Sequence, residues 1–125
     1  MTNLTPEPPE SGPVIKGFGP SGFRIDDTHY DGGVILTPQH AHLWDAPAIN
    51  NLSVEALSEF LSITPPPEFL LLGTGKTLVR PRAAFTRKLE AMDIGVEVMD
   101  SKAAARAWSI LRVEERQIIA AIMPI

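Results

Sequence analysis

The segment 69–72 (Phe-Leu-Leu-Leu) constrains the fold more than any other part of the sequence. Four consecutive large apolar residues give a strand no polar face, so both of its sides must be covered, as in the centre of an α/β sheet. Three prolines at 65–67 prevent a preceding helix from continuing into the strand, and glycines at 73 and 75 end it. The sequence therefore predicts a buried central strand with helices on both sides of its sheet.

Residues 14–44 have the composition of short strands joined by turns. Asp26-Asp27 offers one turn between two such strands. Asp31-Gly32 is a strong hairpin signal, because the two-residue turns of hairpins need residues that tolerate positive φ. This part of the chain predicts an N-terminal β meander.

Three helices are predicted after the meander. Ser53 is a natural N-cap for the first helix, and Pro81 suits the first position of the second. Asp100 and Ser101 cap the third helix, whose apolar stripe includes Trp108. The strands between and after these helices are expected at 69–72, 95–99 and 117–123.

Strands that alternate with helices of 10–12 residues predict a largely parallel sheet with helices on its faces. We therefore expect a single α/β domain over residues 14–125, preceded within that range by the β meander. A chain of 125 residues can bury one core without disulfide bonds. Residues 1–13 are rich in Pro, Glu, Thr and Ser, which predicts a disordered tail.

Composition excludes several functional classes. A net charge of −4 gives no general attraction to nucleic acid or anionic lipid. The absence of cysteine excludes thiolate nucleophiles and cysteine-based metal sites. The N-terminal segment lacks the features of a secretory signal and has no arginine before Arg24, unlike a mitochondrial transit peptide. The longest apolar run, 118–122, is far shorter than the roughly 20 residues of a membrane helix. We expect a soluble, bacterial-type cytoplasmic protein.

The ends of two predicted strands carry polar residues that suit a ligand crevice. In open α/β sheets, ligands favour the crevice outside the carboxyl ends of parallel strands. If the strands at 69–72 and 95–99 are neighbours, their ends form one cleft with cations nearby for an anionic group. The candidate residues are Gly73, Thr74, Gly75, Asp100 and Ser101, with Lys76, Arg80 and Arg82 as the cations. The commoner alternative is that Asp100 and Ser101 only cap the third helix.

The remaining motifs form no catalytic constellation. The Gly-Lys-Thr at 75–77 is not a Walker A loop, because position 70 holds Leu70 in place of the first glycine. His40 and His42 lack a third ligand selected by spacing, so we interpret them as surface histidines and expect no metal or cofactor. Trp44 lies at a strand end and is a candidate partner anchor if exposed, although burial fits the sequence equally well.

Several segments together resemble one known protein family. The matching residues are 17–19 (Gly-Phe-Gly), 22–25 (Gly-Phe-Arg-Ile), 68–75 (Glu-Phe-Leu-Leu-Leu-Gly-Thr-Gly), 95–101 (Gly-Val-Glu-Val-Met-Asp-Ser), Ala103-Ala104, Glu114 and Arg116. Over residues 14–123 the chain resembles the small α/β family that includes mitochondrial complex I assembly factor 3 and many bacterial and archaeal proteins. It departs from the family pattern at 107–109, where relatives often carry Thr-Tyr-Asn and this chain has Ala-Trp-Ser, and at Glu115, where they often have glycine.

The resemblance implies a three-layer fold around a mixed central sheet and no established enzymatic activity. Mitochondrial relatives help assemble respiratory complex I with another assembly factor, and bacterial relatives often lie near protein-translocation genes. The leading hypothesis is therefore a non-catalytic interaction or assembly factor for a membrane complex such as respiratory complex I, cytoplasmic or peripheral to the inner membrane. It predicts a protein partner and an exposed apolar patch. The alternative is a small-molecule or anion-binding α/β protein, or an enzyme, that uses the crevice between 73–76 and 100–101.

Overall fold

The computed structural model describes residues 12–125. The tail predicted over residues 1–13 lies outside the described residues apart from Gly12 and Pro13, which are both buried. The indole Nε1 of Trp108 donates a hydrogen bond of 3.0 Å to the carbonyl of Pro13. Pro13 is thus hydrogen-bonded to the helix that contains Trp108.

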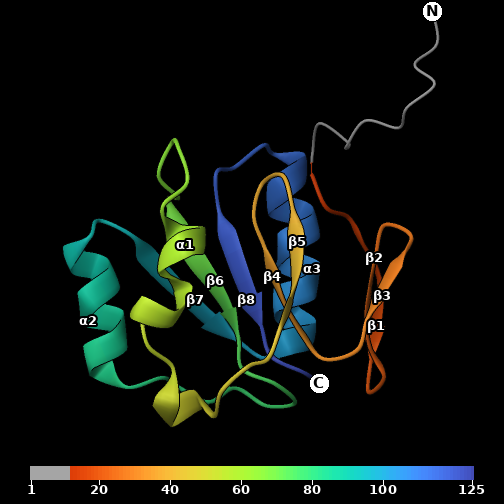
Figure 1. Ribbon diagram of the computed structural model, residues 1–125, viewed down its shortest axis with the longest axis horizontal. Coiled ribbons are helices and arrows are strands. Elements are labelled where there is room, and N and C mark those ends of the chain that lie inside the picture. Colours follow the sequence, from red (N-terminus) through yellow and green to blue (C-terminus); the bar gives the residue numbers. More distant parts are fainter. Residues whose placement is uncertain (1–11) are drawn as a thin grey trace, which may run out of the picture.

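A five-stranded mixed sheet forms the centre of the domain, with the strand order β5-β4-β8-β6-β7 (Figure 1). β6 runs parallel to β7 and β8, whereas β4 runs antiparallel to β8 and β5. The strands are β4 (Gly33–Leu36), β5 (Ala41–Trp44), β6 (Phe69–Gly73), β7 (Gly95–Met99) and β8 (Ile119–Ile122). The mixed central sheet is confirmed, and its parallel half is the part connected through helices.

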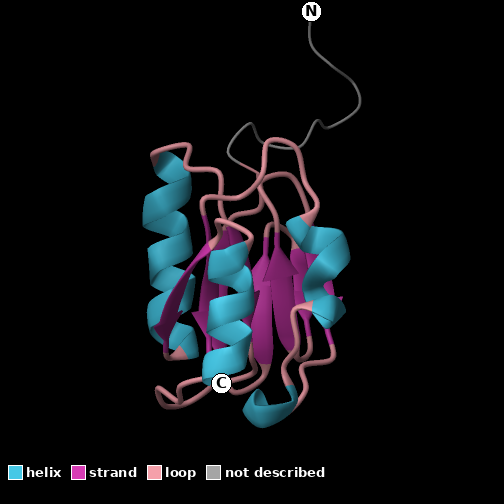
Figure 2. Ribbon diagram, turned by 90° about the vertical axis from the view of Figure 1, so that its left-hand side faces the viewer, coloured by secondary structure: helices cyan, strands magenta, loops and turns pink. Residues whose placement is uncertain are grey.

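Both faces of this sheet are covered, and Figure 2 shows helices on either side of the strands. The helices are α1 (Ser58–Leu61), α2 (Ala83–Ala91) and α3 (Ser101–Val113). Leu70 and Leu72 pack in one core cluster with residues of α1 and α2, whereas Leu71 packs in the other with residues of α3. This alternation follows from the period of two along a strand. The three leucines have no exposed surface, so the three-layer α/β fold is confirmed.

A separate three-stranded antiparallel sheet packs on the α3 side of the domain. Its strands are β1 (Ile15–Gly19), β2 (Gly22–Ile25) and β3 (Thr28–Tyr30). Phe23 and Ile25 of β2 are buried in the core cluster that contains Trp108. The turn expected at Asp26-Asp27 joins β2 to β3, and Asp26 takes a positive φ of 52°.

The hairpin predicted at Asp31-Gly32 is wrong. These residues follow β3 and precede β4, but the two strands belong to different sheets. Gly32 has a φ of 148°, a conformation that glycine adopts readily, and it occurs where the chain passes from the small sheet to the central one. The positive φ of Gly32 therefore occurs where the chain crosses between two sheets and not in a hairpin turn.

The first helix is shorter than its start signals predict. The Ser53 hydroxyl does accept a hydrogen bond of 3.2 Å from the amide of Ala56. The chain then forms a 3₁₀ turn, Glu55–Leu57, and a single α-helical turn, α1. A further 3₁₀ turn, Ile49–Asn51, lies upstream. The prolines at 65–67 leave the chain no room to continue the helix before β6.

The other two helices start close to their predicted positions. α2 begins at Ala83 and not at Pro81, because Arg82 has an extended ψ of 142° and occupies the N-cap position. α3 begins as predicted: the Asp100 carboxylate accepts a hydrogen bond of 2.9 Å from the amide of Ala103.

Candidate functional site

The carboxyl ends of β6 and β7 lie side by side, which is the condition that the crevice hypothesis set. Gly73 is the register partner of Met99, and the amide of Thr74 donates to the Met99 carbonyl at 2.9 Å. The residues brought together by this pairing are Gly73, Thr74, Gly75, Asp100 and Ser101.

Ser101 joins three segments at this end of the sheet. Its hydroxyl donates to the carbonyl of Met123 at 2.6 Å and accepts from the amide of Gly75 at 2.7 Å. Its own amide donates to the Gly75 carbonyl at 2.8 Å. Since the residue has no exposed surface, these bonds form out of contact with water and fix the start of α3 against the ends of β6 and β8.

Thr74 determines the shape of the loop that follows. Its hydroxyl accepts from the amide of Val79 at 3.0 Å and lies 2.7 Å from the carbonyl of Thr77, to which it donates. The Met99 carbonyl is a second possible acceptor, at 3.3 Å. One buried hydroxyl therefore folds residues 74–79 back over the end of β6.

α3 packs directly against the end of β6. A Cβ atom on Gly73 would lie 3.0 Å from the Cβ of Ala104 and 3.1 Å from the Cα of Ser101. Asp100 is engaged as the helix cap. The hydrogen-bonding groups of Thr74, Asp100 and Ser101 are thus used by the protein itself.

The loop after Gly75 presents a different surface. Lys76, Arg80 and Arg82 are all exposed. Two aliphatic residues between the first two cations are exposed as well, Leu78 by 52% and Val79 by 41%. The loop therefore combines positive charge with apolar side chains in contact with solvent.

Trp44 is not an exposed anchor. It is 8% exposed and belongs to the core cluster that contains Leu70 and Leu72. Its position at the end of the edge strand β5 suggested partial exposure, but the side chain faces the helices that cover the sheet.

The two histidines lie at the opposite end of the sheet. The rings of His40 and His42 are 6.3 Å apart, and His42 lies 5.0 Å from the ring of Phe60. All three line an open pocket of about 380 Å³ together with Glu59 and Gln117. Among residues 12–125, no three His, Asp or Glu side chains come together as a metal site would require.

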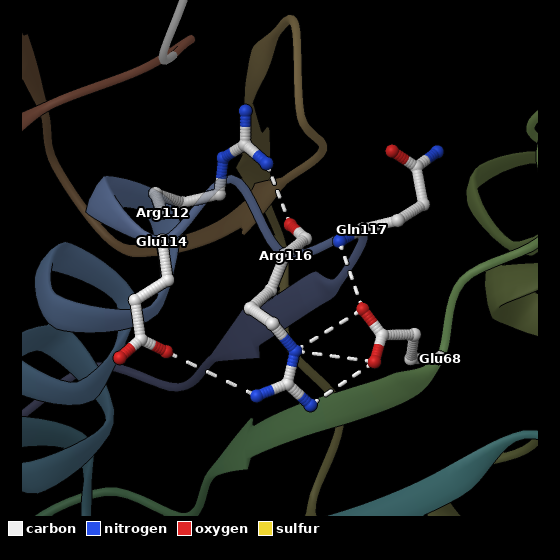
Figure 3. Close-up of polar contacts among 5 residues, drawn as sticks. All are labelled: Glu68, Arg112, Glu114, Arg116 and Gln117. Carbon is white, nitrogen blue, oxygen red and sulfur yellow. Dashed lines mark hydrogen bonds and ion pairs between the residues drawn. The ribbon is translucent and has the colours of Figure 1, made fainter.

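An ion pair fastens the same end of the sheet (Figure 3). The guanidinium of Arg116 donates to both carboxylate oxygens of Glu68, at 3.0–3.2 Å, and the amide of Gln117 adds a bond of 3.2 Å. Arg112 donates to the Arg116 carbonyl at 2.6 Å, and Glu114 lies 4.0 Å from the Arg116 guanidinium. The hydrogen bond from Arg116 lowers the pKa of Glu68, and the same bond raises the pKa of Arg116. In the sequence, Glu68 and Arg116 stood out only as residues that match the family pattern. Their ion pair could not be predicted, because the two residues lie 48 positions apart.

An apolar patch on α3 was missed by the sequence analysis. We define the α3 patch as Val14, Ile110 and Val113, which are exposed by 38%, 64% and 81%. Val14 and Val113 also line a small pocket of about 120 Å³, whose floor includes Trp108. The available signal was the pair of apolar residues three positions apart on the helix face opposite the core stripe.

Solved structures place this architecture among the three-layer α/β domains described as Mth938-like. A Bordetella parapertussis crystal structure matches 94% of this chain and 100% of that chain with a TM-score of 0.83 and 26% identity. A crystal structure described as an outer membrane protein from Bartonella henselae matches 92% of this chain and 97% of that chain, with a TM-score of 0.81 and 27% identity. A Bordetella pertussis solution structure described as an Mth938-like domain matches 98% of this chain and 92% of that chain (TM-score 0.77, 22% identity) and shows the fold alone.

Residues 15–123 match the family model described as "Protein of unknown function (DUF498/DUF598)", and the chain belongs to that family. It is 33% identical, over 91% of its length, to zebrafish NADH dehydrogenase (ubiquinone) 1 alpha subcomplex assembly factor 3, and 26% identical to the Drosophila melanogaster protein of that name over 90%. The chain spans only 66% and 59% of those two proteins. An uncharacterised Rhodobacter capsulatus protein is 28% identical over 88% of this chain and 83% of its own length. Within residues 12–125, no helix combines the length and apolarity that crossing a bilayer requires.

Proposed function

We propose that this protein is a non-catalytic interaction factor that assists the assembly of a membrane complex of the respiratory complex I type, working in the cytoplasm or at the inner-membrane surface. The support from relatives is the set of family members named as complex I assembly factors. The observation that carries the proposal is the α3 patch.

The α3 patch has the features of a protein-docking surface. Val113 and Ile110 lie one helical turn apart and expose more of their surface than any other large apolar residues in the described chain. The adjoining pocket has the size of a single aliphatic or small aromatic side chain. An anchor side chain that fills a pocket beside exposed aliphatic residues is the usual core of a protein interface. The expected partner therefore presents an apolar side chain to α3.

The patch combines residues from two segments of the chain. It lies at the carboxyl end of α3, and Val14 enters it from the segment that precedes β1. Trp108 forms its floor and is held by the hydrogen bond to Pro13. A rigid floor lowers the entropy that a partner loses on binding, because less of the surface must become ordered.

The alternative function, an anion or small-molecule site at the ends of β6 and β7, has weaker support. Its hydroxyl groups on Thr74 and Ser101 already form short hydrogen bonds within the protein. A ligand that used them would have to displace those bonds. The exposed cations of the loop remain available to bind an anionic partner.

Affinity capture after crosslinking in native cells, with membranes included, tests the proposed function. The wild-type protein is expected to recover complex I subunits or another assembly factor, and I110S/V113S to lose them. The matched control is Leu43→Ser, because Leu43 is exposed to a similar extent, by 63%, but belongs to the edge strand β5 and not to the α3 patch. Equal recovery by the patch variant, or no complex I component with the wild type, would contradict the proposal.

A further inference from the structure

The charges of this chain are unevenly distributed along the sequence. The whole protein carries a net charge of −4, yet no carboxylate occurs between Glu68 and Glu90. This interval holds five exposed cations, which are Lys76, Arg80, Arg82, Arg87 and Lys88. All five lie on α2 or on the loop between β6 and α2, so the cations of an acidic protein are concentrated in this segment.

The docking loop, defined as residues 76–82, adds apolar surface to that charge. Leu78 and Val79 are about half exposed between Lys76 and Arg80. The Thr74 hydroxyl bonds to the Thr77 carbonyl and to the Val79 amide, which stabilises the loop conformation that exposes these side chains. Aliphatic side chains flanked by cations are the pattern of segments that enter the interface of an anionic membrane.

A hollow beside the docking loop suits a lipid headgroup. It has a volume of about 490 Å³, and Arg80, Arg87 and the hydroxyl-bearing Thr86 line it. Guanidinium groups form paired hydrogen bonds with phosphate oxygens. Glu97 also lines the hollow, and Lys88 is paired with Glu55 on the neighbouring turn. The cations that remain for the membrane are therefore those of the loop, together with Arg87.

We propose that the docking loop binds the surface of an anionic phospholipid bilayer, with Leu78 and Val79 inserted among the headgroups and Lys76, Arg80 and Arg82 against the phosphates. The inference rests on the proposed function, since a factor for a membrane complex works at the membrane. The geometry is compatible with both roles. α3 starts beside Gly75 and ends at Val113, roughly 18 Å away along its axis, so a docked protein keeps the α3 patch clear of the bilayer.

Sedimentation with vesicles tests the proposal on the full chain. Wild-type protein is expected to bind vesicles that contain phosphatidylglycerol and not vesicles of pure phosphatidylcholine, and high salt should weaken the binding. The triple variant K76Q/R80Q/R82Q is expected to lose on the order of 100-fold in partitioning, from about five-fold for each cation. The charge-matched control K16Q/R24Q/R106Q neutralises three exposed cations that lie on β1, β2 and α3 and not on the docking loop, and it should bind nearly as the wild type does.

The variant L78S/V79S separates insertion from simple charge attraction. It keeps every cation and is expected to partition about 10-fold more weakly, because half-exposed Leu and Val lose their burial among the lipids. Since both residues are solvent-exposed, thermal unfolding should match the wild type. Wild-type protein that ignores anionic vesicles, or loop variants that bind them normally, would overturn the proposal. The proposal would also be overturned if the wild type did not bind vesicles but captured an acidic protein that the loop variants failed to capture. The loop would then bind a protein and not a membrane.

The same assay distinguishes this proposal from the proposed function. The patch variant I110S/V113S should bind anionic vesicles as the wild type does, because its changes lie at the far end of α3. If capture of complex I components fails while vesicle binding survives, only the assembly role is contradicted. If capture succeeds while vesicle binding fails, only the docking loop is contradicted.

Discussion

Replacing Ser101 with alanine tests whether its buried hydrogen bonds hold the ends of β6 and β8 against the start of α3. The Ser101 hydroxyl has no exposed surface and bridges the Gly75 amide and the Met123 carbonyl at 2.7 Å and 2.6 Å. Alanine removes the bridge but leaves both backbone groups buried. The Gly75 carbonyl keeps its bond to the amide of residue 101, so the loss is confined to one donor and one acceptor.

The cost of this substitution follows from the two groups left without partners. Each buried, unsatisfied backbone group costs about 1–3 kcal/mol. Alanine returns about 0.5 kcal/mol through its higher helix propensity at the start of α3. The expected loss of stability is therefore about 1.5–5.5 kcal/mol. For a domain of this size, each kcal/mol lowers Tm by about 4 °C, so Tm should fall by roughly 6–22 °C.

Urea unfolding followed by circular dichroism, with a thermal melt alongside, measures this change. Ser109→Ala is the matched control: it makes the same chemical change on the same helix, where the hydroxyl forms only a weak 3.4 Å bond to the Ala105 carbonyl. The control should lie within about 0.5 kcal/mol of the wild type. If Ser101→Ala lowers the free energy of unfolding as little as the control does, a rearrangement or a water must satisfy the Gly75 amide and the Met123 carbonyl. The hydrogen bonds of Ser101 would then not be essential to this end of the sheet.

Two further predictions concern packing and pH. Gly73→Ala should cost about 1–3 kcal/mol in urea unfolding, because the new methyl group meets α3 at 3.0 Å, whereas Gly19→Ala, with no atom within 4 Å, should cost less than about 1 kcal/mol. The bond from Arg116 lowers the pKa of Glu68 below its ordinary value of 4.5 in the folded state, so the pair stabilises the protein above that pH and the contribution is lost as the pH falls through the lowered pKa. Stability curves below pH 4.5 should thus fall less steeply for Glu68→Gln than for the wild type, while the exposed control Glu90→Gln should follow the wild type; identical slopes for all three would refute this linkage.

The central part of the fold could be predicted because its signals are local. Four apolar residues at 69–72 require cover on both sides, and the structure buries them between two core clusters. Asp100 caps α3 through a bond only three residues away. Asp31-Gly32 gave a wrong hairpin prediction, because a glycine with positive φ also suits the point where the chain leaves one sheet for another. The choice between turning back and crossing over depends on where β4 pairs, which is a non-local property.

The candidate site was only partly predictable, for the same reason. The neighbouring strand ends followed from the alternation of strands and helices. The engagement of Ser101 did not, since its acceptor Met123 lies 22 residues further on. The burial of Trp44 could not be predicted, because a residue on an edge strand is buried only if helices cover the sheet face on which it lies. Prediction of the complete α3 patch would require knowing that Val14 lies beside Val113 at the end of α3.

Photo-crosslinking from the α3 patch in native cells tests the proposed interaction most directly. A photoreactive phenylalanine derivative replaces Val113, and in a control protein it replaces Glu90, which is exposed on α2. If the protein works through the α3 patch, position 113, and not position 90, should crosslink to a complex I subunit or another assembly factor identified by mass spectrometry. Crosslinks that are the same from both positions, or none from position 113, would contradict the claim that this protein is an interaction factor that works through α3.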